Sequence, residues 1–238
     1  MIYIRPYLSD HKIYIVPYAE TMNSFAQNSL LKVLEEPPAY CTIILLVENS
    51  NKLLDTVLSR SQILRFYPLD PWEICGYLMK KNADADKNRI ELASYMCGGS
   101  LGRALEILEN DELFELRSEA LDLLFSLSNE KRKCISDFTV FLKENKNEFE
   151  FVLNIIQGVF RDLLYIKKTG NQNEVLNKDR IKNIEKLADS ISEKTPLLLM
   201  ESLLKHRSYQ QMSMSFGLIA QNFSLEVWEA INDRGYRS

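Results

Sequence analysis

The stretch "IYIVPYAETMNSFAQNSLLKVLEEPPAYCTIILLV", Ile13 to Val47, decides the fold of the first part of the chain. It begins with a short apolar run at 13–16 and ends with five apolar residues in succession at 43–47. Uninterrupted runs of this kind are typical of strands buried on both faces of a parallel sheet. Between them, apolar residues recur at helical spacing. The pattern predicts a strand–helix–strand unit with a right-handed crossover.

The predicted helix has recognisable ends. Ser24 and Gln27 have the spacing of a capping box, so we expect the helix to begin there. Pro37 and Pro38 end it, because proline lacks an amide donor and disfavours helix at the residue before it. A third short strand is expected at 63–66. Since parallel sheets usually need cover on both faces, we expect this thin sheet to be the later part of a larger α/β domain whose front is missing.

From Leu69 onward the patterns are helical. Three short helices are predicted in "PWEICGYLMKKN", "DKNRIELASYMCGG" and "SLGRALEILEND", with Gly98 and Gly99 ending the second and Ser100 capping the third. Longer amphipathic segments follow at 113–128, 130–144, 147–169, 177–193, 196–207 and 211–233. The predicted class is therefore α/β plus all-α, with a parallel α/β part at 1–68, a three-helix domain at 69–112 and a larger helical domain at 113–238.

Composition and charge argue against several classes of protein: autonomous nucleic-acid binders, membrane proteins and metalloproteins. The 238 residues carry a net charge of −4, which makes the chain a poor autonomous binder of nucleic acid. No apolar run is long enough to cross a bilayer and the first residues lack a signal-peptide layout, so we expect a cytoplasmic protein without a membrane partner. The four cysteines are far apart and only two histidines are present, which favours reduced thiols and no metal site.

The α/β part lacks the residues that bind a nucleotide. Phosphate-binding loops need glycine, and the first glycine of the chain is Gly76. The first strand ends in Pro17 and Tyr18, which cannot replace carboxylates that hold Mg²⁺. Glu20 is interpreted as a charge facing a helix N-terminus, and Glu35 with Glu36 as a solvated helix end. We expect no cofactor and no intrinsic enzymatic activity.

Four segments occur together in a known order: "AQNSLLKVLEEPP", "TIILLVEN", "LLDTVLSRSQ" and "GGSLGRALEI". In this order and spacing they resemble the clamp-loader AAA+ family, in particular the delta-prime subunits of bacterial DNA polymerase III. By motif the resemblance extends from Ile4 to Leu108, and beyond that it rests on helical character and length. It implies a partial AAA+ domain, a lid domain at 69–112 and a collar at 113–238. The family's upstream P-loop-like region and four-cysteine zinc module are not in this chain.

The resemblance also implies roles for single residues. The segment 13–20 matches the Walker B strand and departs from it at Pro17 and Tyr18, where active members carry acids. Asn49 lies near the polar end of the sensor 1 strand. Arg103 matches the sensor 2 turn, and with no nucleotide bound it is interpreted as a relic or as a surface residue. Both residues are therefore expected to be sensor-like relics.

Ser59, Arg60 and Ser61 match the family's Ser-Arg-Cys motif, with serine in place of the cysteine. The resemblance implies that Arg60 reaches into the ATP site of a neighbouring subunit as a trans arginine finger. Its chemistry suits this role, because a guanidinium is permanently charged and its fork matches phosphate oxygens. Without the flanking motif, the default interpretation would be a surface salt bridge at a helix end.

The expected function is that of a non-catalytic clamp-loader subunit within the DNA polymerase III holoenzyme. The resemblance implies gamma/tau and delta subunits as partners, together with the sliding clamp and primer-template DNA within the complex. Two alternatives stay open. One is a truncated gamma/tau-type ATPase whose missing front held a P-loop. The other is a helical adaptor unrelated to replication.

Overall fold

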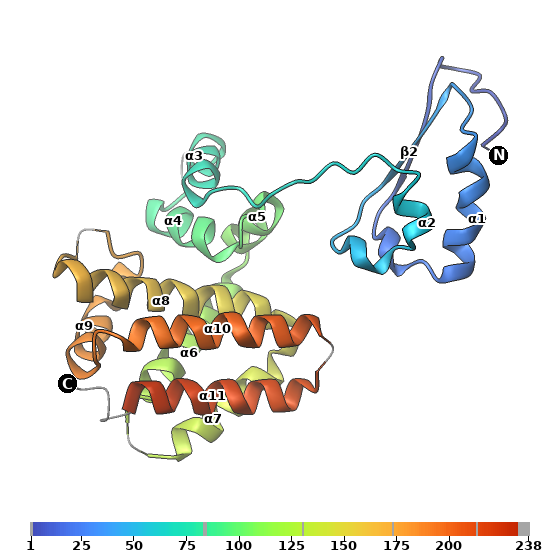
Figure 1. The fold of residues 1–238 in the computed structure, drawn as a ribbon. Helices are drawn as coiled ribbons and strands as arrows, with labels where there is room; N and C mark the ends of the chain where they lie inside the picture. Colours follow the sequence, from blue (N-terminus) through green and yellow to red (C-terminus); the bar gives the residue numbers. More distant parts are fainter. Residues whose placement is uncertain (1, 83–84, 130, 173, 213, 233–238) are drawn as a thin grey trace. The chain divides into compact units, whose positions relative to one another are not determined.

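The computed structural model describes residues 2–82, 85–129, 131–172, 174–212 and 214–232. The chain divides into two compact units, Met1–Tyr67 and Pro68–Ser238. The first unit contains a small parallel sheet with helices, and the second is built from helices (Figure 1). The predicted class, a parallel α/β part followed by an all-α part, is therefore confirmed.

In the first unit, β1 (Lys12–Val16) and β2 (Cys41–Leu45) pair in parallel, with Lys12 opposite Cys41. The connection between them contains α1 (Ser24–Glu35), which packs against the short α2 (Asp55–Leu58). Two 3-10 turns, η1 (Ala19–Thr21) and η2 (Ser50–Lys52), follow the two strands. The predicted strand–helix–strand unit is therefore present.

Two details of the prediction are wrong. No strand forms at 63–66, which lies in a stretch without regular structure. Helix α1 is capped by Asn23, whose Oδ1 accepts a hydrogen bond from the Ala26 amide at 2.9 Å, and not by Ser24. Gln27 does not complete a capping box, because its buried amide bonds elsewhere: it donates to Met22 O, just before the helix, and accepts from Leu54 N, 27 positions away. A buried polar group must be paired, and these contacts pair the Gln27 amide.

The strands are not buried on both faces, contrary to expectation. Side chains along each strand alternate between half-buried and exposed, and Ile13, Ile15 and Ile44 are exposed on the strands. An apolar run shows that both faces of a strand are suited to burial. Whether they are buried depends on which other elements pack against them. In this two-stranded sheet they cover one face only.

The second unit begins with the three predicted short helices, α3 (Pro71–Lys81), α4 (Lys87–Met96) and α5 (Leu101–Glu109). Gly98 and Gly99 end α4 with φ values of 63° and 83°, and Ser100 caps α5, as predicted. A Cβ atom on Gly99 would lie 2.4 Å from Pro68 Cβ. This close approach requires glycine, and the Leu69 amide donates to Gly99 O across it at 3.0 Å.

The six longer helices are also present: α6 (Asp111–Ser126), α7 (Lys133–Glu144), α8 (Phe149–Thr169), α9 (Ile181–Ser190), α10 (Thr195–Gln211) and α11 (Phe216–Asn232). Positions 130, 213 and 233 of the predicted segments lie outside the described residues. Helix α8 packs against α4, α6, α9 and α10, and α10 and α11 lie side by side (Figure 1). One hydrophobic core runs from Ile74 to Ile231. The boundary between 69–112 and 113–238 stays a prediction.

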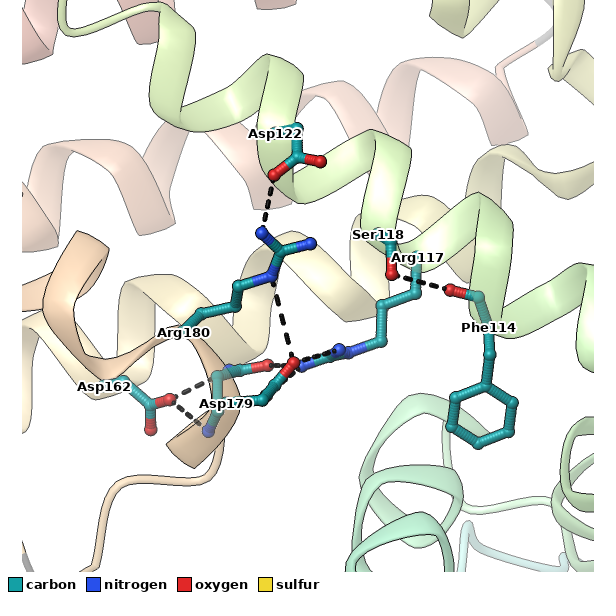
Figure 2. Close-up of polar contacts among 8 residues, drawn as sticks. Phe114, Arg117, Ser118, Asp122, Asp162, Asp179 and Arg180 are labelled. Atoms are coloured by element: carbon teal, nitrogen blue, oxygen red, sulfur yellow. Dashed lines mark hydrogen bonds and ion pairs between the residues drawn. The ribbon is translucent and has the colours of Figure 1, made fainter.

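A buried polar network supports the helices (Figure 2). Arg117 on α6 donates from both terminal nitrogens to Asp179, at 2.8 and 2.9 Å, and to Asn177 Oδ1 at 2.7 Å. Asp162 on α8 is fully buried and accepts hydrogen bonds from the amides of Leu176 and Asn177 and from Asn177 Nδ2. The network therefore fastens the segment at 174–180 to two helices.

This network makes stability depend on pH. Burial of Asp179 opposes its ionisation, but the hydrogen bonds and charge of Arg117, with the charge of Arg180, outweigh burial and hold the pKa of Asp179 below its ordinary 3.8. A carboxyl whose pKa is lowered in the folded state contributes stability above its ordinary pKa, and this contribution is lost as the pH falls through the lowered value. We expect urea unfolding to show a falling free energy of unfolding below about pH 4. Asp179→Asn should reduce that slope, and parallel pH profiles for the two proteins would contradict the prediction.

Candidate functional site

The candidate site lies where α2 ends. Val57 is completely buried and anchors this short helix. The chain then turns through Ser59, Arg60 and Ser61, with the Arg60 amide donating to Val57 O at 3.2 Å and Ser61 Oγ donating to the same carbonyl at 2.8 Å. These local bonds hold the backbone of the motif, so the direction of the Arg60 side chain is set by the structure of the turn.

All three nitrogens of the Arg60 guanidinium have partners. Its Nε and one terminal nitrogen lie 2.9 and 2.8 Å from Glu35 Oε1, at the end of α1. The other terminal nitrogen donates to Thr56 O at 3.1 Å and to Ser59 Oγ at 3.3 Å. The side chains of Arg60 and Glu35 are 36% and 51% exposed. An ion pair this exposed contributes at most about 1 kcal/mol to stability, so its main consequence is to orient the guanidinium.

Glu35 is the residue that sequence reasoning missed. It was expected to be part of a solvated helix end, yet it is the partner of Arg60. The two are separated by 25 positions, and no periodicity relates them. The only available signal was opposite charge, and an acidic chain offers many such pairs.

The exit of β1 has an unusual backbone. Tyr18 has φ 51° and ψ 42°, in the left-handed region that an aromatic residue rarely adopts. The hydroxyl of Thr21 donates to Tyr18 O at 2.8 Å, and the next amide, Ala19 N, donates to Leu46 O at 2.9 Å. Position 18, at the end of the strand, therefore presents an exposed aromatic ring and not a carboxylate.

Glu20 is the carboxylate nearest in sequence, and it has a different task from the one expected. Its Oε1 accepts a hydrogen bond from the Glu48 amide at 3.1 Å, which ties the exit of β1 to the exit of β2. Its Oε2 is buried without a hydrogen-bond partner among the described residues. Glu20 also belongs to the three-residue turn η1, whose dipole is too short to explain its position.

The two sensor-like residues are both engaged in local contacts. Asn49 caps η2 and accepts from the Asn51 amide at 3.0 Å. In the second unit, Arg103 forms an ion pair with Glu106 at 2.7 Å and a second with Glu148, and it lies over the ring of Phe151 at 5.3 Å. No hydrogen bond joins Asn49 to Arg60 in the part of the chain that the structure describes. Asn49 and Arg103 are therefore engaged in capping and ion pairing.

Within the described residues, no group of histidine, cysteine and acidic side chains is arranged to hold a metal ion. The four cysteines are free, and burial raises the pKa of the Cys97 thiol. No helix in the described ranges is long and apolar enough to cross a membrane.

Two family models match the chain. Residues 1–70 match "DNA polymerase III, delta subunit", and residues 111–217 match "DNA polymerase III, delta subunit, C terminal". The delta-prime subunit of DNA polymerase III from Bacillus subtilis is 32% identical over 184 residues, which cover 76% of this chain and 54% of the relative. The tau subunit of the same organism is 25% identical, covering 85% of this chain and 39% of its own length.

Among solved structures, a DNA clamp loader delta protein from Bacillus subtilis aligns over 96% of this chain and 80% of its own, at 16% identity and a TM-score of 0.38. That score is too low to establish a common fold. The chain spans 54% of the length of its delta-prime relative. The family models and this relative agree with the resemblance carried by the four motifs, and the chain belongs to the family of DNA polymerase III clamp-loader subunits.

Proposed function

We propose that this chain is a non-catalytic, cytoplasmic subunit of the bacterial replicative clamp loader, which assists ATP-dependent loading of the sliding clamp onto primed DNA. The observation that carries this proposal is the match of 1–70 and 111–217 to two parts of the same polymerase III subunit family. The proposed partners are gamma/tau and delta subunits, with the clamp and primer-template DNA bound within the complex.

Within this function, Arg60 serves the ATP site of a neighbouring motor subunit. Its geometry supports the assignment, because Glu35 orients a partly exposed guanidinium at the end of a short anchored helix. A planar, permanently charged fork is suited to the charge that develops on a transferred phosphoryl group. Glu35 acts as a positioning residue in this assignment. Asn49 and Arg103 are assigned no part in nucleotide chemistry, because no glycine for a phosphate-binding loop precedes Gly76 in this sequence.

Assembly is assigned to the helices after α5. Leucines spaced seven residues apart are exposed on α10 and α11: Leu197, Leu204, Leu218 and Leu225. A seven-residue spacing places side chains on one stripe of a helix, and apolar stripes of this kind suit packing against a partner helix. The interface proposed for the collar therefore includes these two helices.

Placing a charge on this stripe should weaken assembly. We expect Leu204→Glu to reduce co-elution with gamma/tau and delta subunits on a sizing column, because a carboxylate would have to be buried in an apolar interface. Gln210→Glu, which adds the same charge at an exposed position of the same helix, is the matched control. Undiminished co-elution of the Leu204→Glu chain, with the purified fold intact, would remove this stripe from the interface.

The similarity to gamma and tau subunits is the observation that favours the alternative function, a truncated gamma/tau-type ATPase. We expect the purified chain to show no saturable binding of Mg-ATP by calorimetry, because β1 exits through Pro17 and Tyr18 and no glycine precedes Gly76. A gamma subunit measured in parallel is the positive control. Binding at micromolar concentration would contradict the non-catalytic assignment and favour the ATPase.

A further inference from the structure

A cavity of 560 Å³ lies inside the second unit, between the segment that leads into α3, the helix α4, and the helices α6, α8 and α10. Its size is within the range of pockets that enclose a small organic molecule. Much of its wall is apolar, from Leu92, Met96, Ile155 and Met200. None of these residues belongs to the candidate site in the first unit.

Three arginines from three helices line the same cavity, namely Arg117, Arg161 and Arg207, and they face one lining carboxylate, Glu150. The chain as a whole is acidic, with a net charge of −4. The cavity opens to solvent, and each of the three arginines pairs with a carboxylate: Arg117 with Asp179, Arg161 with Asp162 and Arg207 with Glu150. A preference for an anionic ligand therefore depends on the donors that these pairs leave unused.

The three guanidinium groups differ in what they have left to donate. Arg117 is 4% exposed, its terminal nitrogens bind Asp179, and its Nε is buried without a hydrogen-bond partner among the described residues. Arg207 donates to Asn154 and Gln157, and its Nε lies 2.8 Å from Glu150 Oε1, at ion-pair distance but outside hydrogen-bonding geometry. Both Nε atoms are shielded from solvent, so neither Arg117 nor Arg207 offers this donor to a ligand in the cavity.

Arg161 is the most available of the three. Its side chain is 40% exposed, and within the described residues a single terminal nitrogen makes its polar contacts, with Asp162 at 3.2 Å and Glu174 O at 3.5 Å. The guanidinium lies over the ring of Tyr95, 5.5 Å from its centroid. It therefore presents unused donors beside an aromatic side chain at the wall of the cavity.

We infer that this cavity binds a carboxylate attached to a bulky apolar group. The carboxylate would lie against the guanidinium of Arg161, and the apolar group would pack against Leu92, Met96 and Met200. A monoanion fits this wall better than a phosphate dianion, because Glu150, Asp162 and Asp179 already offset the positive charge of the three arginines. Two sources carry this chemistry, the C-terminal residue of a peptide and a free aryl-alkanoic acid. The inference does not depend on the proposed function.

The test is a nuclear magnetic resonance titration of the isotope-labelled full chain with N-acetyl-phenylalanine, with its neutral amide, and with 3-phenylpropionate. The acid is expected to bind about tenfold more tightly than the amide, because only the acid offers a charged acceptor to the Arg161 guanidinium. Arg161→Gln should weaken binding of the acid about tenfold and leave the amide unchanged. Lys168→Gln, which removes a charge from an exposed position on the same helix, should change neither.

A second variant guards against a folding defect in the first. Tyr95→Leu keeps all three arginines and should weaken binding of both phenyl acids by removing an aromatic neighbour. Binding of both acids indicates a free organic acid as the source of the carboxylate, and binding of N-acetyl-phenylalanine alone indicates a peptide C-terminus. Equal binding of acid and amide, an unchanged affinity in Arg161→Gln, or no saturable shifts at cavity residues with either acid would overturn the inference.

Discussion

Replacing Arg60 with alanine is expected to slow ATP hydrolysis by the assembled clamp loader while leaving the chain folded. A trans arginine contributes roughly 10³–10⁵ in rate at the single site that it serves. The loss in bulk turnover will be smaller, because the other ATP sites keep their own arginines. Stability should change by at most about 1 kcal/mol, since the ion pair that the substitution removes is half-exposed.

The measurement is DNA-stimulated ATP turnover in a complex reconstituted with the variant chain. Arg65→Ala is the matched control, because Arg65 is exposed and lies outside the Ser59–Ser61 motif. Glu35→Gln tests whether the ion pair is needed to orient Arg60. The variant retains an oxygen that can accept a hydrogen bond from Arg60 but removes the ion pair, so it should reduce turnover less than Arg60→Ala. Full turnover with Arg60→Ala in a complex of normal composition would exclude Arg60 from the mechanism.

Replacing Asp162 with alanine is expected to produce a large loss of stability. This carboxylate is completely buried and accepts hydrogen bonds from Leu176 N, Asn177 N and Asn177 Nδ2 at 3.0, 2.9 and 2.8 Å. Its removal leaves those donors without an acceptor and Arg161 without its ion pair. Each of the three donors left without an acceptor costs about 1–3 kcal/mol, so the total loss should be about 3 kcal/mol or more.

The free energy of unfolding from urea titration measures this loss. Asp122→Ala is the control, because Asp122 also pairs with an arginine, Arg180, but its side chain is 61% exposed. That pair should contribute at most about 1 kcal/mol. A loss of less than about 1 kcal/mol for Asp162→Ala would show that the segment at 174–180 is not held by this network.

Much of the fold was predictable from local sequence. The apolar runs at 13–16 and 43–47 and the helical spacing between them identify the strand–helix–strand unit, because side chains of one face must repeat with the period of the element. The glycines at 98 and 99 mark the end of α4, since both have positive φ. All nine predicted helices after Leu69 have counterparts in the described residues. Local patterns are sufficient to predict these helices and strands, because the interactions that form them lie mostly within one helical turn or one strand.

Most of the errors arise where the cause lies far along the chain. The buried amide of Gln27 and the open face of the two strands depend on which segments come together, and residue types alone do not reveal this. The expected strand at 63–66 fails for the same reason, since a strand forms only where a partner strand supplies its hydrogen bonds. The cap at Asn23 is different, because its bond to the Ala26 amide is local and asparagine is a common N-cap residue.

The sequence by itself determined the family, through four motifs in order, and it placed Arg60 in one of them. Only the tertiary structure decided what Arg60 contacts, and it revealed Glu35 as the partner. It also brought Arg117, Arg161 and Arg207 to one cavity from three helices. The physical reason is that a motif is a run of neighbours along the chain, whereas ion pairs and cavities are formed by residues that only packing makes neighbours in space.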